Sequence, residues 1–181
     1  MKRFLIVLTV AAVAAIGFGG VAASASANKL QTFGDGTVTI GADGDSATIV
    51  LSAGQFGGVY LNSKSQSAKP LNAVHFSFVS TGDVTGGAPR FSIPIDTDGV
   101  GGTVEGYAFL DAAGCGGVSG VATLVSTSSG DCHVNFLGAD YANWAAFADA
   151  NPTSRIAPGF IPFIIADGSA GTYVVENIDL R

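Results

Sequence analysis

Short apolar runs recur along this chain, and each is separated from the next by a cluster of glycine, aspartate, serine or asparagine residues. From Asn28 onward the runs follow one another at intervals of about 8 to 12 residues, which is the spacing of antiparallel strands and their turns. Residues 73–80 also alternate between apolar and polar side chains, as a strand with one buried face does. We expect Val74, Phe76 and Phe78 to form the inner face of this strand. The pattern therefore predicts an all-β protein.

Nine or ten strands are expected from these runs. They cover residues 36–40, 46–51, 57–62, 73–80, 90–95, 106–110, 118–126, 133–137, 162–166 and 172–179. The acidic residues support this class, because 12 of the 14 are aspartate, which favours turns, and only two are glutamate, which favours helices. Short strands with short connections predict one two-sheet antiparallel sandwich that is jelly-roll-like in architecture.

Residues 140–150 break this pattern and predict one short helix. The apolar residues that recur there at helical spacing are Tyr141, Trp144, Phe147 and Ala148. Asp140 stands where an N-cap is expected, and Asn151 and Pro152 form a stop signal. We expect this helix to cover an end or an edge of one sheet.

The first 27 residues have the pattern of a removable export signal. Lys2 and Arg3 give a basic start, a long apolar run follows, and the sequence Ala-Ser-Ala at the end offers the small residues that a signal peptidase accepts. The alternative is a retained membrane anchor over residues 4–23, a stretch long enough to cross a bilayer. Cleavage is favoured, and it leaves one secreted domain, residues 28–181, that is free of the membrane.

The charge of the chain excludes some classes of partner, and its cysteine content predicts a covalent cross-link. Eight basic residues against 14 acidic ones give a net charge of −6, and loss of Lys2 and Arg3 makes it more negative, so nucleic acids and anionic lipid surfaces are repelled. Cys115 and Cys132 are the two cysteines, and in an exported protein a single pair predicts a disulfide. A metal-binding or catalytic thiol is the alternative, and His133 is the one further ligand that adjoins them.

The acidic stretch 96–99, with the sequence DTDG, partly matches a calcium-binding loop. Carboxylates supply the oxygen ligands that calcium takes, and glycine permits a sharp bend. Asp96, Asp98 and Glu105 are therefore candidate ligands of a structural calcium ion, although Pro94 stands where the first aspartate of such a loop belongs. The alternative is an acidic, solvated turn that follows a strand.

Four aromatic residues are candidates for binding a ligand, namely Tyr60, Tyr107, Tyr141 and Trp144. Secreted modules that bind sugars usually offer exposed aromatic faces for stacking, with polar neighbours. Trp144 also belongs to the apolar stripe of the predicted helix, so packing in the core is the alternative for this side chain. The tyrosines are the better surface candidates, because the phenol end tolerates water.

Hydrolysis by a nucleophile and an imidazole needs a histidine beside a serine or cysteine. The chain has two histidines, His75 and His133, and neither lies in a recognisable nucleophile motif. A serine next to His75, or a cleft lined by carboxylates, is the arrangement that favours a small secreted hydrolase. Without such a motif no catalytic residue is predicted, and a protein without enzymatic activity is favoured.

Residues 171–180, GTYVVENIDL, resemble the last strand of the galactose-binding-like jelly rolls found in carbohydrate-binding modules, which often close with a y-v-D-N-v-x-L pattern. Glu176 stands where that family usually has aspartate. The resemblance covers this strand alone, and it implies a sandwich that binds carbohydrate.

The leading hypothesis is thus a secreted domain that binds a glycan or a cell-wall surface. A structural or interaction protein of the cell envelope is the second hypothesis, and a small hydrolase is the third.

Overall fold

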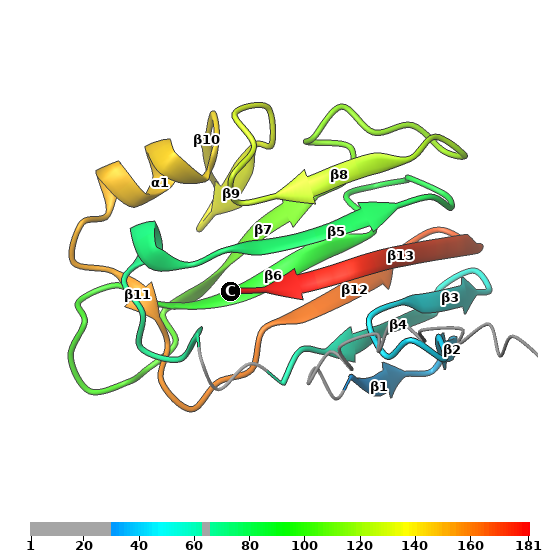
Figure 1. Ribbon diagram of the computed structural model, residues 1–181, viewed down its shortest axis with the longest axis horizontal. Coiled ribbons are helices and arrows are strands. Elements are labelled where there is room, and N and C mark those ends of the chain that lie inside the picture. The colour runs from blue at the N-terminus through cyan, green and yellow to red at the C-terminus, as the bar shows by residue number, and fades with distance from the viewer. Residues whose placement is uncertain (1–29, 63–65) are drawn as a thin grey trace, which may run out of the picture.

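The computed structural model describes residues 30–62 and 66–181, and these fold into two antiparallel β-sheets that pack face to face (Figure 1). The expected export signal, residues 1–27, lies outside the described residues. The larger sheet has eight strands, in the order β1 (Gln31–Gly34), β4 (Phe56–Tyr60), β12 (Phe163–Asp167), β6 (Arg90–Asp96), β7 (Gly106–Asp111), β9 (Val134–Phe136) and β10 (Ala139–Tyr141), with β11 (Arg155–Ile156) paired to β6. The smaller sheet has five strands, in the order β2 (Thr37–Ile40), β3 (Ala47–Leu51), β13 (Gly171–Leu180), β5 (Phe76–Ser80) and β8 (Thr123–Ser126). The predicted fold class, an all-β two-sheet sandwich with one short helix, is confirmed.

The core lies between the sheets and is built by the alternation seen in the sequence. Phe76 and Phe78 are buried on the inner face of β5, as expected, and Val74 is buried too, although β5 begins only at Phe76 and residue 73 lies in a 3-10 turn. The rings of Phe76 and Phe78 both contact Phe91 of β6, with centroids 5.8 and 4.8 Å apart. Since β5 and β6 belong to different sheets, these contacts join the two layers. The outward-facing residues of β6 then lie on the far side of the larger sheet.

The predicted strands match the observed ones except at a few places. The sequence pattern missed three short strands, β1, β10 and β11. The predicted strand at residues 118–126 is too long, because β8 begins only at Thr123. Gly116 and Gly120 have positive φ angles of 78° and 77°, and the amide of Val121 donates to the carbonyl of Val118, so the residues before β8 form turns instead.

The helix is present but begins later than predicted. α1 spans Trp144–Ala150, and its N-cap is Asn143, whose side-chain oxygen accepts a hydrogen bond from the amide of Ala146 at 2.9 Å. The prediction that Asp140 caps the helix is wrong, because this residue lies in β10 and accepts a hydrogen bond from Asn135. α1 packs against β10 and against a short 3-10 turn, Leu71–Ala73, at one end of the sandwich (Figure 1).

Cys115 and Cys132 form a disulfide, as the cysteine count predicted. The bond joins the turn that follows β7 to the segment that leads into β9, across 17 positions of sequence. Cys132 is fully buried in the core, and Cys115 packs at its edge. Among the described residues, no helix has the length and apolar character needed to cross a membrane.

Candidate functional site

An aromatic cluster lies on the outer face of the eight-stranded sheet. It consists of Phe33 in β1, Tyr60 in β4, Tyr107 in β7 and Phe163 in β12. Phe163 is at its centre, with ring centroids 5.5 Å from Phe33, 6.0 Å from Tyr60 and 5.6 Å from Tyr107. Phe33 and Tyr60 also contact each other, at 4.5 Å. Four strands that are far apart in sequence thus bring four rings into one surface.

Strand alternation and register put these rings on the same face. In β4, Val59 is fully buried in the core, so its neighbour Tyr60 points outward. Tyr60 pairs directly with Phe163 of β12. Residues opposite each other on neighbouring strands carry their side chains on the same face, which explains the contact between these two rings.

A glycine allows the Phe33 ring to lie close to the sheet. Gly58 pairs with Phe33, and a Cβ added to this glycine would lie only 2.6 Å from the Cζ atom of the Phe33 ring. It would also lie 2.2 Å from the carbonyl oxygen of Ile164, a backbone atom that cannot move aside easily. The backbone of β4 at Gly58 therefore forms part of the support under the cluster.

The aromatic cluster is accessible to solvent. The Tyr60 residue is 38% exposed, and the other three rings are half-buried. The loop that leads into β12 also exposes two apolar side chains, because Phe160 is 45% exposed and Ile161 is 47% exposed, although neither has a ring contact with the cluster among the described residues. An extended apolar and aromatic surface of this kind, next to polar residues, is typical of a binding site.

The charged groups beside the cluster are already paired. Arg90 of β6 donates two hydrogen bonds to the carboxylate of Asp167, at 2.5 and 2.8 Å, and its guanidinium lies 5.2 Å from the centroid of the Phe109 ring. Farther along the sheet, the side-chain amide of Asn135 donates to Asp140 at 2.8 Å. The Arg90–Asp167 pair fixes side chains on the strands that carry the cluster, and the Asn135–Asp140 bond fixes those at the sheet edge.

Of the four aromatic residues predicted from the sequence, Tyr60 and Tyr107 meet in the cluster through Phe163. Trp144 does not belong to it. This residue is 3% exposed, its Nε1–H donates to the carbonyl of Leu71 at 2.7 Å, and so the alternative of core packing holds for it. Tyr141 is half-buried, and its ring lies 5.2 Å from Phe147 of the helix, away from the cluster.

Sequence reasoning missed Phe33 and Phe163. The signal for Phe163 was its place in the run predicted as a strand, but this run is apolar throughout, and only the structure shows Ile164 and Ala166 buried at alternate positions. This alternation leaves Phe163 on the outer face. Phe33 carried no such signal, because β1 was not predicted as a strand.

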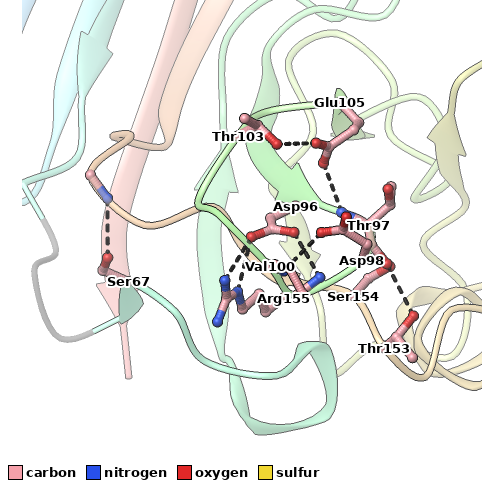
Figure 2. A network of polar contacts seen from close by, with 12 residues as sticks. Ser67, Asp96, Thr97, Asp98, Val100, Thr103, Glu105, Thr153, Ser154 and Arg155 are labelled. Carbon is pink, nitrogen blue, oxygen red and sulfur yellow. Dashed lines mark hydrogen bonds and ion pairs between the residues drawn. The ribbon is translucent and has the colours of Figure 1, made fainter.

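The acidic loop after β6 is held together by contacts within the protein (Figure 2). Asp96 is fully buried, and its Oδ2 atom accepts a hydrogen bond from Nε of Arg155 at 3.0 Å and lies 2.9 Å from Nη2 of the same guanidinium in an ion pair. Its Oδ1 atom accepts from the amide of Gly99, which has a positive φ of 71°. Burial by itself raises the pKa of Asp96, but the hydrogen bonds from Arg155 and Gly99 and the charge of Arg155 outweigh it, so the pKa is lowered.

The other two acidic residues of this loop are also engaged. Asp98 accepts a hydrogen bond from the amide of Val100 at 2.8 Å. Glu105 accepts from the Thr103 hydroxyl and from the amide of Thr97, and these two bonds lower the pKa of Glu105. Both contacts are drawn in Figure 2.

These contacts do not fit the predicted calcium site. Within residues 30–62 and 66–181, no three histidine, cysteine, aspartate or glutamate side chains come together as ligands for one metal ion. The carboxylate of Asp96, which was expected to face the ion, faces the cation of Arg155 instead. The geometry resembles the acidic turn that was the alternative, and binding of calcium by Asp96, Asp98 and Glu105 stays a prediction.

His75 lies beside a serine, which is the arrangement that favours a hydrolase. Its Nδ1 atom is 2.8 Å from Oγ of Ser128, at the edge of a pocket of about 210 Å³ that Leu71 and Trp144 also line. Its Nε2 atom is 3.8 Å from Oδ2 of Asp179, which is beyond hydrogen-bonding distance.

Two features of this group differ from a catalytic triad. The same oxygen of Asp179 lies 2.7 Å from Nε of Arg181 in an ion pair, so this carboxylate faces the arginine. The amide of Ser128 donates to the Ser126 hydroxyl and that of Ser129 donates to the Ser126 carbonyl, so neither can donate to an oxyanion. The hydrogen bond between His75 and Ser128 joins the segment before β5 to the loop after β8.

No family model matches this chain, and its sequence matches no curated protein. Among solved structures, the chain is similar to the C-terminal family 22 carbohydrate-binding module of Clostridium thermocellum Xyn10B. The two are 13% identical, the match covers 86% of this chain and 87% of that chain, and the TM-score is 0.33.

Proposed function

We propose that this protein is a secreted, non-catalytic β-sandwich that binds a glycan through the aromatic cluster on its eight-stranded sheet. The observation that carries the proposal is the convergence of Phe33, Tyr60, Tyr107 and Phe163 on one accessible face. The disulfide between Cys115 and Cys132 supports an exported protein, because such bonds persist in oxidising compartments.

The chemistry of the cluster suits a sugar. A sugar ring has an apolar face that can lie on an aromatic ring and hydroxyl groups at its edge that need polar partners, and sites of this kind combine both. The net charge of −6 disfavours an acidic polysaccharide, since like charges repel. A neutral glycan of a cell wall or similar surface is the ligand class that fits best.

A binding assay on insoluble polysaccharides tests the proposal. The protein is mixed with cellulose, chitin, mannan, xylan or peptidoglycan, and the fraction that stays in solution is measured. Retention on at least one of these is expected, and Tyr60→Ala is expected to bind it about 3- to 10-fold more weakly through loss of one stacking contact. Phe56→Ala is the matched control, because Phe56 lies on the same strand and is 44% exposed, but its ring is not part of the cluster. Equal loss in both variants, or no binding to any of the five materials, contradicts the proposal.

A second candidate function is that of a structural or interaction protein of the cell envelope. The observation that favours it is the position of β8 at the end of the five-stranded sheet, next to the exposed aliphatic side chains Val118, Val121 and Leu124. An unpaired strand edge with apolar neighbours is a common contact surface. A concentration-dependent oligomer together with no affinity for polysaccharides favours this function over glycan binding.

A further inference from the structure

Ser92 lies at the centre of the outer face that carries the aromatic cluster. Its neighbours in β6, Phe91 and Ile93, are fully buried in the core, so the Ser92 side chain points to the opposite face of the sheet. It pairs directly with Phe163 of β12 on one side and with Phe109 of β7 on the other. A small polar residue is thus placed between two aromatic residues.

The hydroxyl of Ser92 is buried without a partner. The residue is 1% exposed, and no hydrogen-bond partner for its Oγ atom is found among the described residues. Most buried polar side chains in folded proteins do have a partner, and a hydroxyl without one lowers stability. Such a group needs an explanation, and a bound ligand is one.

Two rings of the cluster come from the strands on either side of Ser92. Phe163 and Tyr107 come from β12 and β7, which are the two neighbours of β6. Their ring centroids are 5.6 Å apart, so the rings meet over β6. Phe163 pairs with Ser92, and Tyr107 pairs with Pro94, the next outward residue of β6. Ser92 and Pro94 are therefore the two outward residues of β6 between the strand positions that carry the two rings.

We propose that Ser92 determines specificity at the glycan site by forming a hydrogen bond with a sugar hydroxyl. The rings of Tyr107 and Phe163 separate when the sugar binds, and Ser92 Oγ then becomes accessible. A serine hydroxyl can donate and accept, so it suits a neutral, polyhydroxylated ligand. Arg90, two residues away on the same face, has its guanidinium engaged by Asp167, whereas the buried hydroxyl of Ser92 has no partner among the described residues. The inference rests on the proposed function.

The test compares two serines that differ in the face they occupy. Ser80 of β5 is also fully buried and also has an unpartnered Oγ, but it lies on the inner face with Phe76 and Phe78. Ser92→Ala and Ser80→Ala each remove an unpaired hydroxyl, so neither is expected to lower the melting temperature. The binding isotherms of both variants and of the unaltered protein are measured on cellulose, chitin, mannan, xylan and peptidoglycan.

Ser92→Ala is expected to bind about 3- to 10-fold more weakly than the unaltered protein, which corresponds to loss of one hydrogen bond, while Ser80→Ala binds as before. If both variants keep full affinity for a material that the unaltered protein binds, the role of Ser92 is overturned and the proposed function stands. If the unaltered protein binds none of the five materials, the proposed function fails and the role of Ser92 fails with it. A lowered melting temperature of Ser92→Ala also overturns the inference, because it means that the hydroxyl is already satisfied in the free protein.

Discussion

Arg155 forms a hydrogen-bonded ion pair with the fully buried carboxylate of Asp96, with Nε and Nη2 at 3.0 and 2.9 Å from the same oxygen. The two residues lie opposite each other in the short pairing of β11 with β6. The pair therefore attaches the segment that follows the helix to the centre of the larger sheet.

Replacement of Arg155 by methionine is expected to destabilise the protein strongly. It leaves the carboxylate of Asp96 buried without its cation, and breaking a buried ion pair in this way lowers the free energy of unfolding by about 3–5 kcal/mol. Chemical denaturation followed by fluorescence measures the change. Arg181→Met is the control, because Arg181 pairs with Asp179 at the surface, where its side chain is 74% exposed. A loss below about 1 kcal/mol is expected there, and similar losses in both variants contradict this account of Asp96.

The Asp96–Arg155 pair also predicts how stability depends on pH. The pKa of Asp96 in the folded protein is lowered from its ordinary value of 3.8, so the folded state binds this proton less readily than the unfolded state. The contribution of Asp96 is complete above the unfolded pKa and is lost as the pH falls through the lower folded pKa. In Arg155→Met, burial of the carboxylate dominates and raises the pKa of Asp96. Protonation of Asp96 then removes the unpaired buried charge and restores stability to the variant. Unfolding measured from pH 8 downward is expected to show the gap between the two proteins beginning to narrow above about pH 4, as Asp96 of the variant takes up its proton, and narrowing further below it, as the unaltered protein loses the contribution of Asp96. A constant gap contradicts this.

Calcium is expected to have little effect on stability. The three candidate ligands Asp96, Asp98 and Glu105 accept hydrogen bonds from within the protein, and Asp96 is neutralised by a cation. A ligand that binds only the folded state raises the melting temperature, so thermal unfolding with a chelator and with millimolar calcium measures binding directly. Coincident curves support the acidic-turn arrangement. A clear rise with calcium, reversed by the chelator, instead establishes the calcium site that the sequence pattern predicts.

Ser128 is expected to be unreactive despite its hydrogen bond with His75. The carboxylate of Asp179 is held by Arg181, and the amides of Ser128 and Ser129 are used within their turn, so the serine lacks both an orienting carboxylate and an oxyanion site. Incubation with a fluorophosphonate followed by mass spectrometry tests this, with a known serine hydrolase as the positive control. Labelling of Ser128 that disappears in His75→Ala would favour the hydrolase hypothesis.

Local patterns in the sequence predicted the features that depend on residues close together in the chain, such as the buried face of a strand or the presence of a helix. The alternation at Phe76 and Phe78 predicted the inner face of β5. The apolar spacing around Trp144 predicted a helix, and the alternative that Trp144 packs in the core is what the structure shows. The helix start was misplaced because Asp140 and Asn143 are both good N-cap residues, and only the pairing of β10 with β9 excludes the first.

The aromatic cluster depends instead on which strands become neighbours. Tyr60 and Phe163 are about a hundred positions apart, and no periodicity within either run indicates that β12 inserts between β4 and β6. Arg155 was missed as a partner of Asp96 for the same reason, because β11 is only two residues long. Contacts between distant short strands carry little local signal.

The insertion of β12 between β4 and β6 also determines when the aromatic cluster can form during synthesis of the chain. Phe163 belongs to the last of the eight strands in sequence, and it joins the rings of β1 and β4 to that of β7. A chain that emerges from its N-terminal side cannot display the assembled cluster until residue 163 and its strand have arrived. Nascent copies in which β12 has not yet formed therefore lack the proposed binding surface, and we expect any binding through the cluster to begin only once this strand is in place.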